Sequence, residues 1–406
     1  MNPSERRKGK LVLADGTRFD GRLVGAGRLP VWGEVVFNTS MTGYQEIVTD
    51  PSYAGQIIVM TYPQIGNYGV HDDDNESLSP SARGLVVREL SSFFSPGPGR
   101  RSLEEFMVRR ELPGLTEVDT RSVTLRIRSG GAVVGVIGPA ERSDGELMDL
   151  ARSVRDRVGR GLVQPAGPKP LRSRPGKKGR VAVVDFGVKE SIVSSLRKLG
   201  VETIVFSAEE ALARGFDAGC ILSGNFDAVV ISNGPGDPAD VPGAVESLRK
   251  LVGKVPVLGI CLGHQIAALA LGGATYKLKF GHRGANQPVV HCGTGRTYIT
   301  SQNHGYAVCP SIVERDTRIR VTYTNLNDGT VEGFADDERL IECVQFHPEA
   351  SPGPHDTAFI FDEFLSRVRA RKTALDRANA RGDACESLDE GNGACVSSGV
   401  SNAQEI

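Results

Sequence analysis

The chain has 406 residues, of which 39% are hydrophobic and 24% are charged, as in soluble globular proteins. This length predicts two or three domains. The 48 basic and 49 acidic residues nearly cancel, which argues against a nucleic-acid or anionic-membrane partner. The polar N-terminus lacks a signal-peptide core, and no apolar run approaches the roughly 18 residues of a membrane span. Seven scattered cysteines indicate reduced thiols in a cytoplasmic protein.

The first 158 residues mix short β-rich runs, such as GEVVFNTS and QIIVMTY, with one helical stretch near residues 103–110. Strands this short, broken by Gly and Pro, predict a compact α+β domain. Residues 159–180, GRGLVQPAGPKPLRSRPGKKGR, combine Pro, Gly and basic residues without periodicity and are predicted to be a linker.

Residues 181–371 alternate strand-like and helix-like segments. Continuous Val/Ile runs such as VAVVD and AVVIS are separated by amphipathic stretches such as ESIVSSLRKLG. This alternation predicts a doubly wound parallel sheet. Residues 372–406 are polar and are predicted to be a disordered tail.

Cys261 lies between two apolar runs in KVPVLGICLGHQIAALALGG, residues 254–273, with Gly259 and Gly263 on either side. The runs predict a buried strand followed by a helix, so the thiol is expected at the carboxyl end of the strand, where ligands bind. Such a corner resembles a nucleophile elbow, in which the helix N-terminus favours a thiolate and the Leu262 N–H can bind an oxyanion. Taken alone, the pattern also fits a small buried core cysteine.

A base for this thiol is offered by LIECVQFHPEASPGPHD, residues 340–356. Pro348 favours an extended conformation at His347, and side chains two positions apart on an extended segment share a face. Glu349 can therefore bind one imidazole nitrogen while the other nitrogen faces Cys261. The three residues would form a nucleophile, a base and a group that orients the base.

Two further stretches offer a platform for a substrate. FDAVVISNGPGDP, residues 226–238, ends a buried strand in a turn whose Gly234 and Gly236 allow close approach of backbone N–H groups to a ligand. TSQNHGYAV, residues 300–308, offers Asn303 and the backbone polar groups around Gly305 and Tyr306.

No metal site is predicted from the sequence. The acidic run Asp72–Asp74 stands without a second carboxylate cluster and is expected in a solvated loop. His291 and Cys292 are adjacent, which makes them poor co-ligands on an extended segment. The chain also lacks a phosphate-binding GxxxxGK[ST] loop, so any ATP chemistry is expected on a partner.

The stretches GICLGHQ, SNGPGDP, SQNHGYAV and QFHPEASPGPHD resemble the class I glutamine amidotransferase domain. GEVVFNTSMTGYQEIVTDPSYAGQIIVMTYPQIGNYG and GLTEVDTRSVT resemble the N-terminal domain of carbamoyl-phosphate synthase small subunits. The resemblance covers roughly residues 10–370, and its N-terminal part is the more specific one because other amidotransferases of the class lack that domain. It implies a small N-terminal α+β domain of the swivelling β/β/α type, followed by a doubly wound, flavodoxin-like class I amidotransferase domain.

The resemblance also implies roles for individual residues. Cys261 matches the nucleophile, His347 the base and Glu349 its orienting carboxylate. Leu262 and Gly234 match the backbone positions of the oxyanion hole. The glutamine-binding positions are matched by Ser52, Gly236, Gln265, Asn303, Gly305 and Tyr306. Tyr306 stands where the family usually has Phe, a change that a backbone contact would tolerate.

The function that the resemblance implies is hydrolysis of L-glutamine to glutamate and ammonia through a cysteine thioester. Ammonia would pass to a large synthetase subunit, in at least a small–large heterodimer, and that subunit would use ATP, Mg²⁺ and bicarbonate to make carbamoyl phosphate. No cofactor is expected on this chain. The product would serve arginine or pyrimidine biosynthesis, and the sequence does not choose between them.

Two alternatives stay open on the sequence alone. A free-standing thiol hydrolase would use the same three residues and would need no partner. A non-catalytic regulatory subunit on the same fold would be signalled by loss of Cys261, His347 or Glu349, and all three are present.

Overall fold

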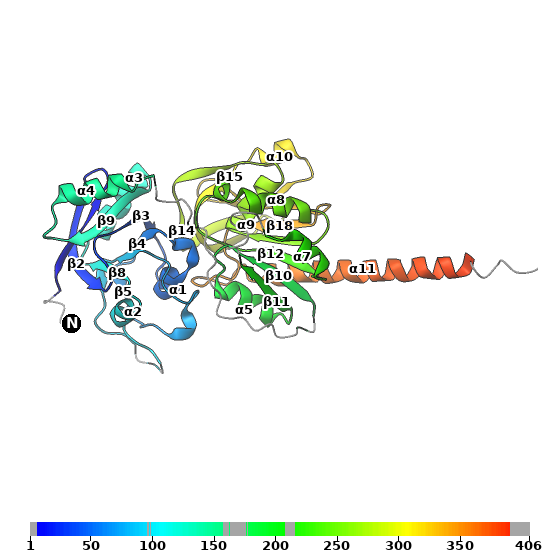
Figure 1. The fold of residues 1–406 in the computed structure, drawn as a ribbon, viewed down its shortest axis with the longest axis horizontal. Helices are drawn as coiled ribbons and strands as arrows, with labels where there is room; N and C mark the ends of the chain where they lie inside the picture. Colours follow the sequence, from blue (N-terminus) through cyan, green and yellow to red (C-terminus); the bar gives the residue numbers. More distant parts are fainter. Residues whose placement is uncertain are drawn as a thin grey trace, which may run out of the picture.

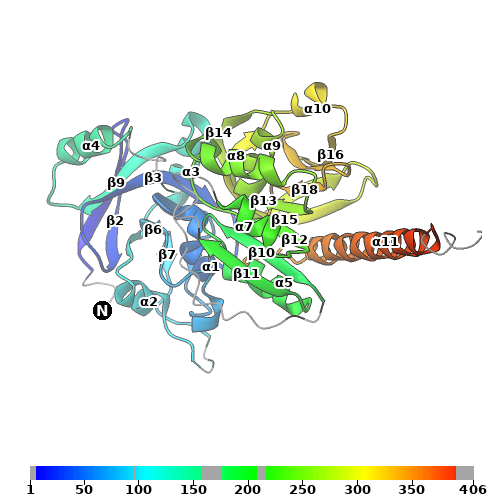
Figure 2. The ribbon, with the colours of Figure 1, turned by 45° about the vertical axis from the view of Figure 1, so that its right-hand side comes forward.

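The computed structural model of the chain describes residues 6–95, 97, 99–156, 162, 176, 178–207 and 216–389. Two domains lie side by side, the first coloured blue to blue-green and the second green to red (Figure 1). A long helix, α11 (Phe359–Asp389), extends from the second domain away from the first (Figures 1 and 2). None of the described helices is both long and apolar enough to cross a membrane.

A closed barrel forms the centre of the N-terminal domain, with the strand order β1–β2–β8–β6–β4–β3–β9. Side chains alternate along its strands, so Leu11 and Leu13 point into the barrel while Val12 packs outward against a helix. The strand bounds are β1 (Lys8–Leu13), β2 (Arg18–Gly25), β3 (Val31–Asn38), β4 (Gln56–Met60), β6 (Gly84–Val86), β8 (Pro113–Thr116) and β9 (Val133–Pro139); the short strands β5 (Gln64–Ile65) and β7 (Glu89–Leu90) pair beside it.

Four helices cover this barrel: α1 (Tyr44–Thr49), α2 (Leu103–Arg109), α3 (Thr120–Gly130) and α4 (Asp144–Ser153). Helices α1 and α2 pack on one outer surface, α4 packs on another, and α3 contributes side chains to the barrel core. Helix α2 confirms the helix expected near residues 103–110. The α+β prediction therefore holds for this domain, and closure of its strands into a barrel is an addition to it.

The C-terminal domain contains a nine-stranded sheet in the order β11–β10–β12–β13–β18–β17–β15–β14–β16. Its first five strands are parallel and have the order of a flavodoxin-like sheet, as predicted. The parallel strands are β10 (Arg180–Asp185), β11 (Glu202–Ser207), β12 (Ala228–Ile231), β13 (Val257–Ile260) and β18 (Ile341–Val344); the antiparallel strands are β14 (Thr275–His291), β15 (Thr297–Val308), β16 (Arg320–Asn325) and β17 (Val331–Asp336).

Helices cover both faces of the parallel strands because alternate apolar residues bury on opposite sides. Ala182 and Val184 of β10 face α7 (Ala218–Ser223), α8 (Pro242–Leu251) and α9 (Leu262–Ala270). Val181 and Val183 face α5 (Glu190–Lys198) and the first turns of α11. The other helices among the described residues are α10 (Ile312–Arg315) and the single turns η2 (Pro51–Tyr53), η3 (Asp72–Asp74) and η4 (Pro238–Asp240).

The two domains meet along a seam that hydrogen bonds, ion pairs and the Phe37–Phe280 ring contact cross. Glu76 accepts hydrogen bonds from the Ser191 N–H and hydroxyl at 3.1 and 2.7 Å. Lys277 of β14 pairs with Glu34 of β3 at 2.9 Å, and the Ala132 N–H donates to the Lys279 carbonyl at 2.9 Å. The barrel is thus attached to the second domain at two places, the N-terminus of α5 and the strand β14.

Two predictions about segment boundaries meet the structure differently. Most of the linker predicted for residues 159–180 lies outside the described residues. The tail predicted as disordered from residue 372 differs from the structure as far as residue 389, because α11 continues to Asp389. Alanine, leucine and arginine, which favour helix in the absence of packing, are frequent in this segment. Residues 390–406 lie outside the described residues.

The first turn and the middle of α11 are expected to differ in their contribution to stability. Phe361 is 1% exposed in the apolar core between the sheet, α5 and α11, so Phe361→Ala should lower the free energy of unfolding by about 3–5 kcal/mol. Leu375, on the same helix, is 50% exposed, so Leu375→Ala should change it by no more than about 0.5 kcal/mol. Urea denaturation of both variants measures the difference. Equal effects would contradict the burial of Phe361 and the exposure of Leu375.

Candidate active site

Cys261 lies where β13 turns into α9, as the sequence predicts. Its φ of 54° is in the left-handed region, which a non-glycine residue adopts only at a strain cost of roughly 1–3 kcal/mol. The side chain is 2% exposed, and its Sγ lies 3.6 Å from the Asn303 carbonyl oxygen. The residue is therefore held in a strained, enclosed position at the carboxyl end of the parallel strands.

The flanking glycines are required by close packing of the helix on the sheet. A Cβ at Gly263 would lie 2.1 Å from the Ile231 carbonyl oxygen, and one at Gly259 would lie 2.8 Å from both Cys343 Sγ and the Gly263 carbonyl oxygen. Both contacts are too short for any side chain. The glycine pattern therefore brings α9 against β12 and β13 and fixes the corner that carries Cys261.

His347 and Glu349 follow β18 and are both buried. His347 Nδ1 lies 2.6 Å from Glu349 Oε1, so the carboxylate fixes this nitrogen as the protonated one. Burial alone would lower the pKa of His347, but the Glu349 charge and the nearby Cys261 raise it to about 10. The second nitrogen, Nε2, makes no hydrogen bond within the described part of the chain. The imidazole is thus oriented by the carboxylate and stays close to the thiol.

Lys189 completes this buried array, although sequence reasoning did not select it. Its Nζ lies 2.9 Å from Glu349 Oε1 and donates to the Ala350 carbonyl at 2.6 Å. Burial would raise the pKa of Glu349, whereas Lys189 and His347 lower it to about 2. A lysine between a strand and a helix is ordinarily exposed to solvent. The one sequence signal for a buried Lys189 is its position just after the apolar strand β10.

A cavity beside Cys261 is lined by nearly all the residues predicted to hold a ligand: Ser52, Gly234, Gly236, Gln265, Asn303, Gly305 and Tyr306. Leu262 is buried and is not among the lining residues. The side chain of Gln265 donates to the Tyr306 carbonyl at 2.9 Å. The structure therefore brings together four segments that are distant in the sequence.

Ser52 reaches this cavity from the N-terminal domain. Asn233 Nδ2 donates to Ser52 Oγ at 2.9 Å across the seam. Asp50, which sequence reasoning missed, accepts from the Ser52 N–H at 2.9 Å and from Asn303 Nδ2 at 3.0 Å. One carboxylate thus ties the serine turn of the barrel to the Asn303 segment of the second domain.

Charged residues from both domains also line the cavity, and no local sequence pattern points to them. Glu34 comes from β3, while Lys277 and Arg283 come from β14. Burial raises the pKa of Glu34, but Arg283 and Lys277 together lower it below its usual value. The cavity therefore presents one anionic and two cationic side chains in addition to its amide, hydroxyl and backbone groups.

His264, three residues after Cys261, lies outside this arrangement. It is fully buried on α9, and its Nδ1 lies 3.1 Å from Gln345 Oε1. Burial lowers the pKa of His264 to about 3, so this imidazole is neutral. His347 is accordingly the histidine positioned to serve the thiol.

Comparison with known proteins gives a family for each domain. Residues 182–367 match the family described as glutamine amidotransferase class-I, which defines the class of the second domain. Residues 11–137 match the family described as carbamoyl-phosphate synthase small chain, CPSase domain.

Curated relatives extend the match over most of the chain. The carbamoyl phosphate synthase small chain of Listeria monocytogenes is 46% identical over 370 residues, covering 89% of this chain and 97% of that protein. The pyrimidine-specific small chain of Bacillus subtilis is 43% identical over 365 residues, covering 89% and 96%. The chain belongs to the carbamoyl phosphate synthase small chain family.

The buried His347–Glu349 pair predicts a dependence of stability on pH. The pKa of His347 is raised in the folded chain, so its contribution is complete below about pH 6.5 and is lost as the pH rises through about 10. The free energy of unfolding of the wild type should therefore fall between about pH 7 and pH 10. Glu349→Gln should flatten this slope. Urea denaturation across the range measures both, and identical slopes would contradict the pairing.

Lys189 is predicted to stabilise the array. Lys189→Met leaves Glu349 buried without its cation and should lower the free energy of unfolding by about 3–5 kcal/mol. The matched control is Lys198→Met at the exposed end of α5, which should change stability by less than about 0.5 kcal/mol. Equal stability of the two variants would mean that Glu349 finds another partner.

Proposed function

We propose that this chain is the glutamine-hydrolysing subunit of a carbamoyl phosphate synthase, with Cys261, His347 and Glu349 as its catalytic triad. The observation that carries the proposal is the convergence of a strained, enclosed thiol with a buried His–Glu pair beside a cavity that both domains line. The family of the chain supports the same conclusion, because its relatives are named as small chains of that synthase.

The reaction begins when Cys261 Sγ attacks the side-chain amide carbon of L-glutamine. His347 has taken the thiol proton, and as an imidazolium it gives a proton to the amide nitrogen. The carbon–nitrogen bond breaks and ammonia leaves, which produces a γ-glutamyl thioester on Cys261. Neutral His347 then removes a proton from water, the resulting hydroxide attacks the thioester, and glutamate leaves as the thiol regains its proton.

Glu349 and Lys189 act through His347. The carboxylate keeps Nδ1 protonated, so that Nε2 is the nitrogen that exchanges protons with the thiol and the leaving group. Lys189 keeps the carboxylate ionised within the core. This arrangement of charges lets His347 carry a positive charge although its side chain is buried.

Backbone N–H groups at Leu262 and Gly234 are proposed to bind the oxyanion that forms in both steps. A Cβ at Gly234 would lie 2.4 Å from the Phe186 carbonyl oxygen, so this turn requires glycine to approach the elbow. Glutamine itself would be held by Ser52, Gly236, Gln265, Asn303, Gly305 and Tyr306.

The proposed partner is a large synthetase subunit in a small–large heterodimer. That subunit would hold the ATP, Mg²⁺ and bicarbonate chemistry, and this chain would need no cofactor for hydrolysis. Free ammonia becomes mostly ammonium in water at pH 7, so delivery inside a complex preserves the nucleophile. We further expect a cytoplasmic location, since the described cysteines Cys220, Cys261, Cys292, Cys309 and Cys343 are free thiols.

The experiment measures glutamate release from glutamine by the purified chain, alone and with a large synthetase subunit. Release should depend on Cys261 and should accelerate when the large subunit is added. Cys261→Ala should lose glutamine-dependent carbamoyl phosphate synthesis by a factor of about 10³ or more, because no nucleophile remains. Synthesis from added ammonia by the same complex should persist.

Each other outcome points to one alternative. Cys261-dependent release that ignores the large subunit would indicate a free-standing thiol hydrolase. Release by the wild type no greater than by Cys261→Ala, with and without the partner, would leave a non-catalytic subunit. Loss of ammonia-dependent synthesis in Cys261→Ala would show that the variant disturbs the partner, and not only the nitrogen supply.

A further inference from the structure

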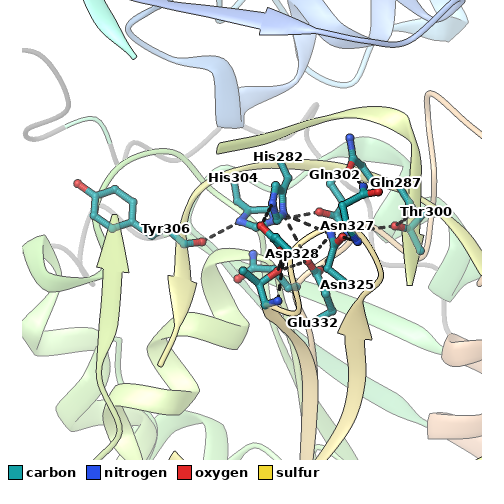
Figure 3. Close-up of polar contacts among 12 residues, drawn as sticks. His282, Gln287, Thr300, Gln302, His304, Tyr306, Asn325, Asn327, Asp328 and Glu332 are labelled. Atoms are coloured by element: carbon teal, nitrogen blue, oxygen red, sulfur yellow. Dashed lines mark hydrogen bonds and ion pairs between the residues drawn. The ribbon is translucent and has the colours of Figure 1, made fainter. Parts of the chain in front are cut away.

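Two histidines and a glutamate meet in the antiparallel part of the second domain, behind the Tyr306 segment. His282 of β14, His304 of β15 and Glu332 of β17 are all buried, and one possible ligand atom from each lies within 4.8 Å of the other two (Figure 3). They come from three different strands and lie far apart in the sequence. The proposed hydrolysis uses none of them as a proton donor or nucleophile.

The outer nitrogen of each imidazole is firmly bound. His282 Nε2 lies 2.8 Å from Asp328 Oδ2, and His304 Nδ1 lies 2.7 Å from the Tyr306 carbonyl oxygen (Figure 3). Both partners are acceptors, so both outer nitrogens carry protons. Histidines that bind metals are oriented in this way, by a carboxylate or a backbone carbonyl on the nitrogen that faces away from the ion.

The inner nitrogen of His304 has no good partner in this arrangement. It faces Gln302 Oε1 at 3.1 Å. The orientation of that amide is fixed, because Gln302 Nε2 donates to Thr300 Oγ1 at 3.2 Å and to Glu332 Oε2 at 3.0 Å. In the neutral imidazole the proton lies on Nδ1, because that nitrogen donates to the Tyr306 carbonyl. Two lone pairs, on His304 Nε2 and Gln302 Oε1, therefore face each other.

The inner nitrogen of His282 is also loosely bound. Its Nδ1 lies 3.4 Å from Glu332 Oε1 and 3.5 Å from Asn325 Nδ2, both beyond a good hydrogen bond. A separation near 3.4 Å is the one expected for two neighbouring ligands of a tetrahedral ion bound at about 2.0–2.1 Å. The two imidazoles are thus tightly bonded at their outer nitrogens and loosely bonded at their inner ones. Glu332 accepts from Asn325 Nδ2 at 3.0 Å, Thr330 Oγ1 at 3.2 Å and Gln302 Nε2 at 3.0 Å.

We infer that His282 Nδ1, His304 Nε2 and a carboxylate oxygen of Glu332 form a binding site for a zinc-class divalent metal ion, with Gln302 Oε1 as the fourth ligand. Two imidazoles with oxygen ligands suit Zn²⁺. Such an ion would accept both facing lone pairs and balance the buried charge of Glu332. Asp328 and the Tyr306 carbonyl would be the outer partners that orient the two imidazoles.

The ion would cross-link β14, β15 and β17 and would lie one imidazole away from the Tyr306 carbonyl. That carbonyl also accepts from Gln265 of α9. The site would therefore have a structural role in holding the Tyr306 segment, and its occupancy can be measured without any assay of catalysis.

The test uses the full chain with Cys261→Ala, which removes the active-site thiol as a competing ligand. The protein is stripped with a chelator, reloaded with Zn²⁺, freed of excess ion by gel filtration and analysed for metal by mass spectrometry. About one Zn²⁺ per chain and a rise in melting temperature on reloading are expected. His282→Gln and Glu332→Gln in this background should lose the ion, and His291→Gln, the matched control at the other end of β14, should keep it.

If those two variants fail to fold, the Co²⁺ form of the Cys261→Ala chain decides. A visible spectrum of tetrahedral Co²⁺ without a thiolate charge-transfer band supports the His₂Glu site. A dominant thiolate band would assign the ion to an exposed cysteine and overturn the inference. Metal content at the buffer background after reloading, or equal content in folded Glu332→Gln and His291→Gln, would also overturn it.

Discussion

The rest of the site depends on one buried carboxylate. Glu349 lies between Lys189, which follows β10, and His347, which follows β18, and it contacts both through a single oxygen. Burying an unpaired carboxylate would be very costly, and so would burying either cation without it. The three side chains are therefore stable only together. Their contacts hold the segments that follow β10 and β18 in fixed positions relative to each other, beside Cys261.

This arrangement explains why the site lies where it does in the sheet. The carboxyl ends of β10, β12, β13 and β18 meet at one edge, and the buried charges require that edge to be closed to water. The barrel domain supplies the closure, with Ser52, Asp50 and Glu34 contributing to the seam. A flavodoxin-like sheet alone would leave the thiol and its base more exposed.

Sequence reasoning recovered the elements with a strong local signal. The Gly-x-Cys-x-Gly corner was predictable because only glycine permits the contacts at Gly259 and Gly263. The His347–Glu349 spacing was predictable because Pro348 restricts the chain locally. The parallel, doubly wound sheet followed from alternating Val/Ile runs and amphipathic stretches, and its flavodoxin-like type was implied by the resemblance.

The remaining features depend on contacts between distant segments. Lys189 and Asp50 have ordinary surroundings in the sequence, and their roles arise only when three or four chain segments converge. Closure of the barrel depends on pairing between β1 and β9, at opposite ends of the domain. The helix over residues 372–389 was missed because its polar pattern lacks the apolar stripe by which a packed helix is recognised.

Asp50 joins the two domains at the wall of the cavity. Its two oxygens connect the serine turn of one domain to Asn303 of the other, while each domain retains its own apolar core. The shape of the cavity is therefore set by how the two domains are docked on each other. A small rigid rotation of the barrel would alter the fit for a ligand and leave both cores unchanged. A partner that binds both domains at once could therefore change the shape of the cavity without contacting the residues that line it.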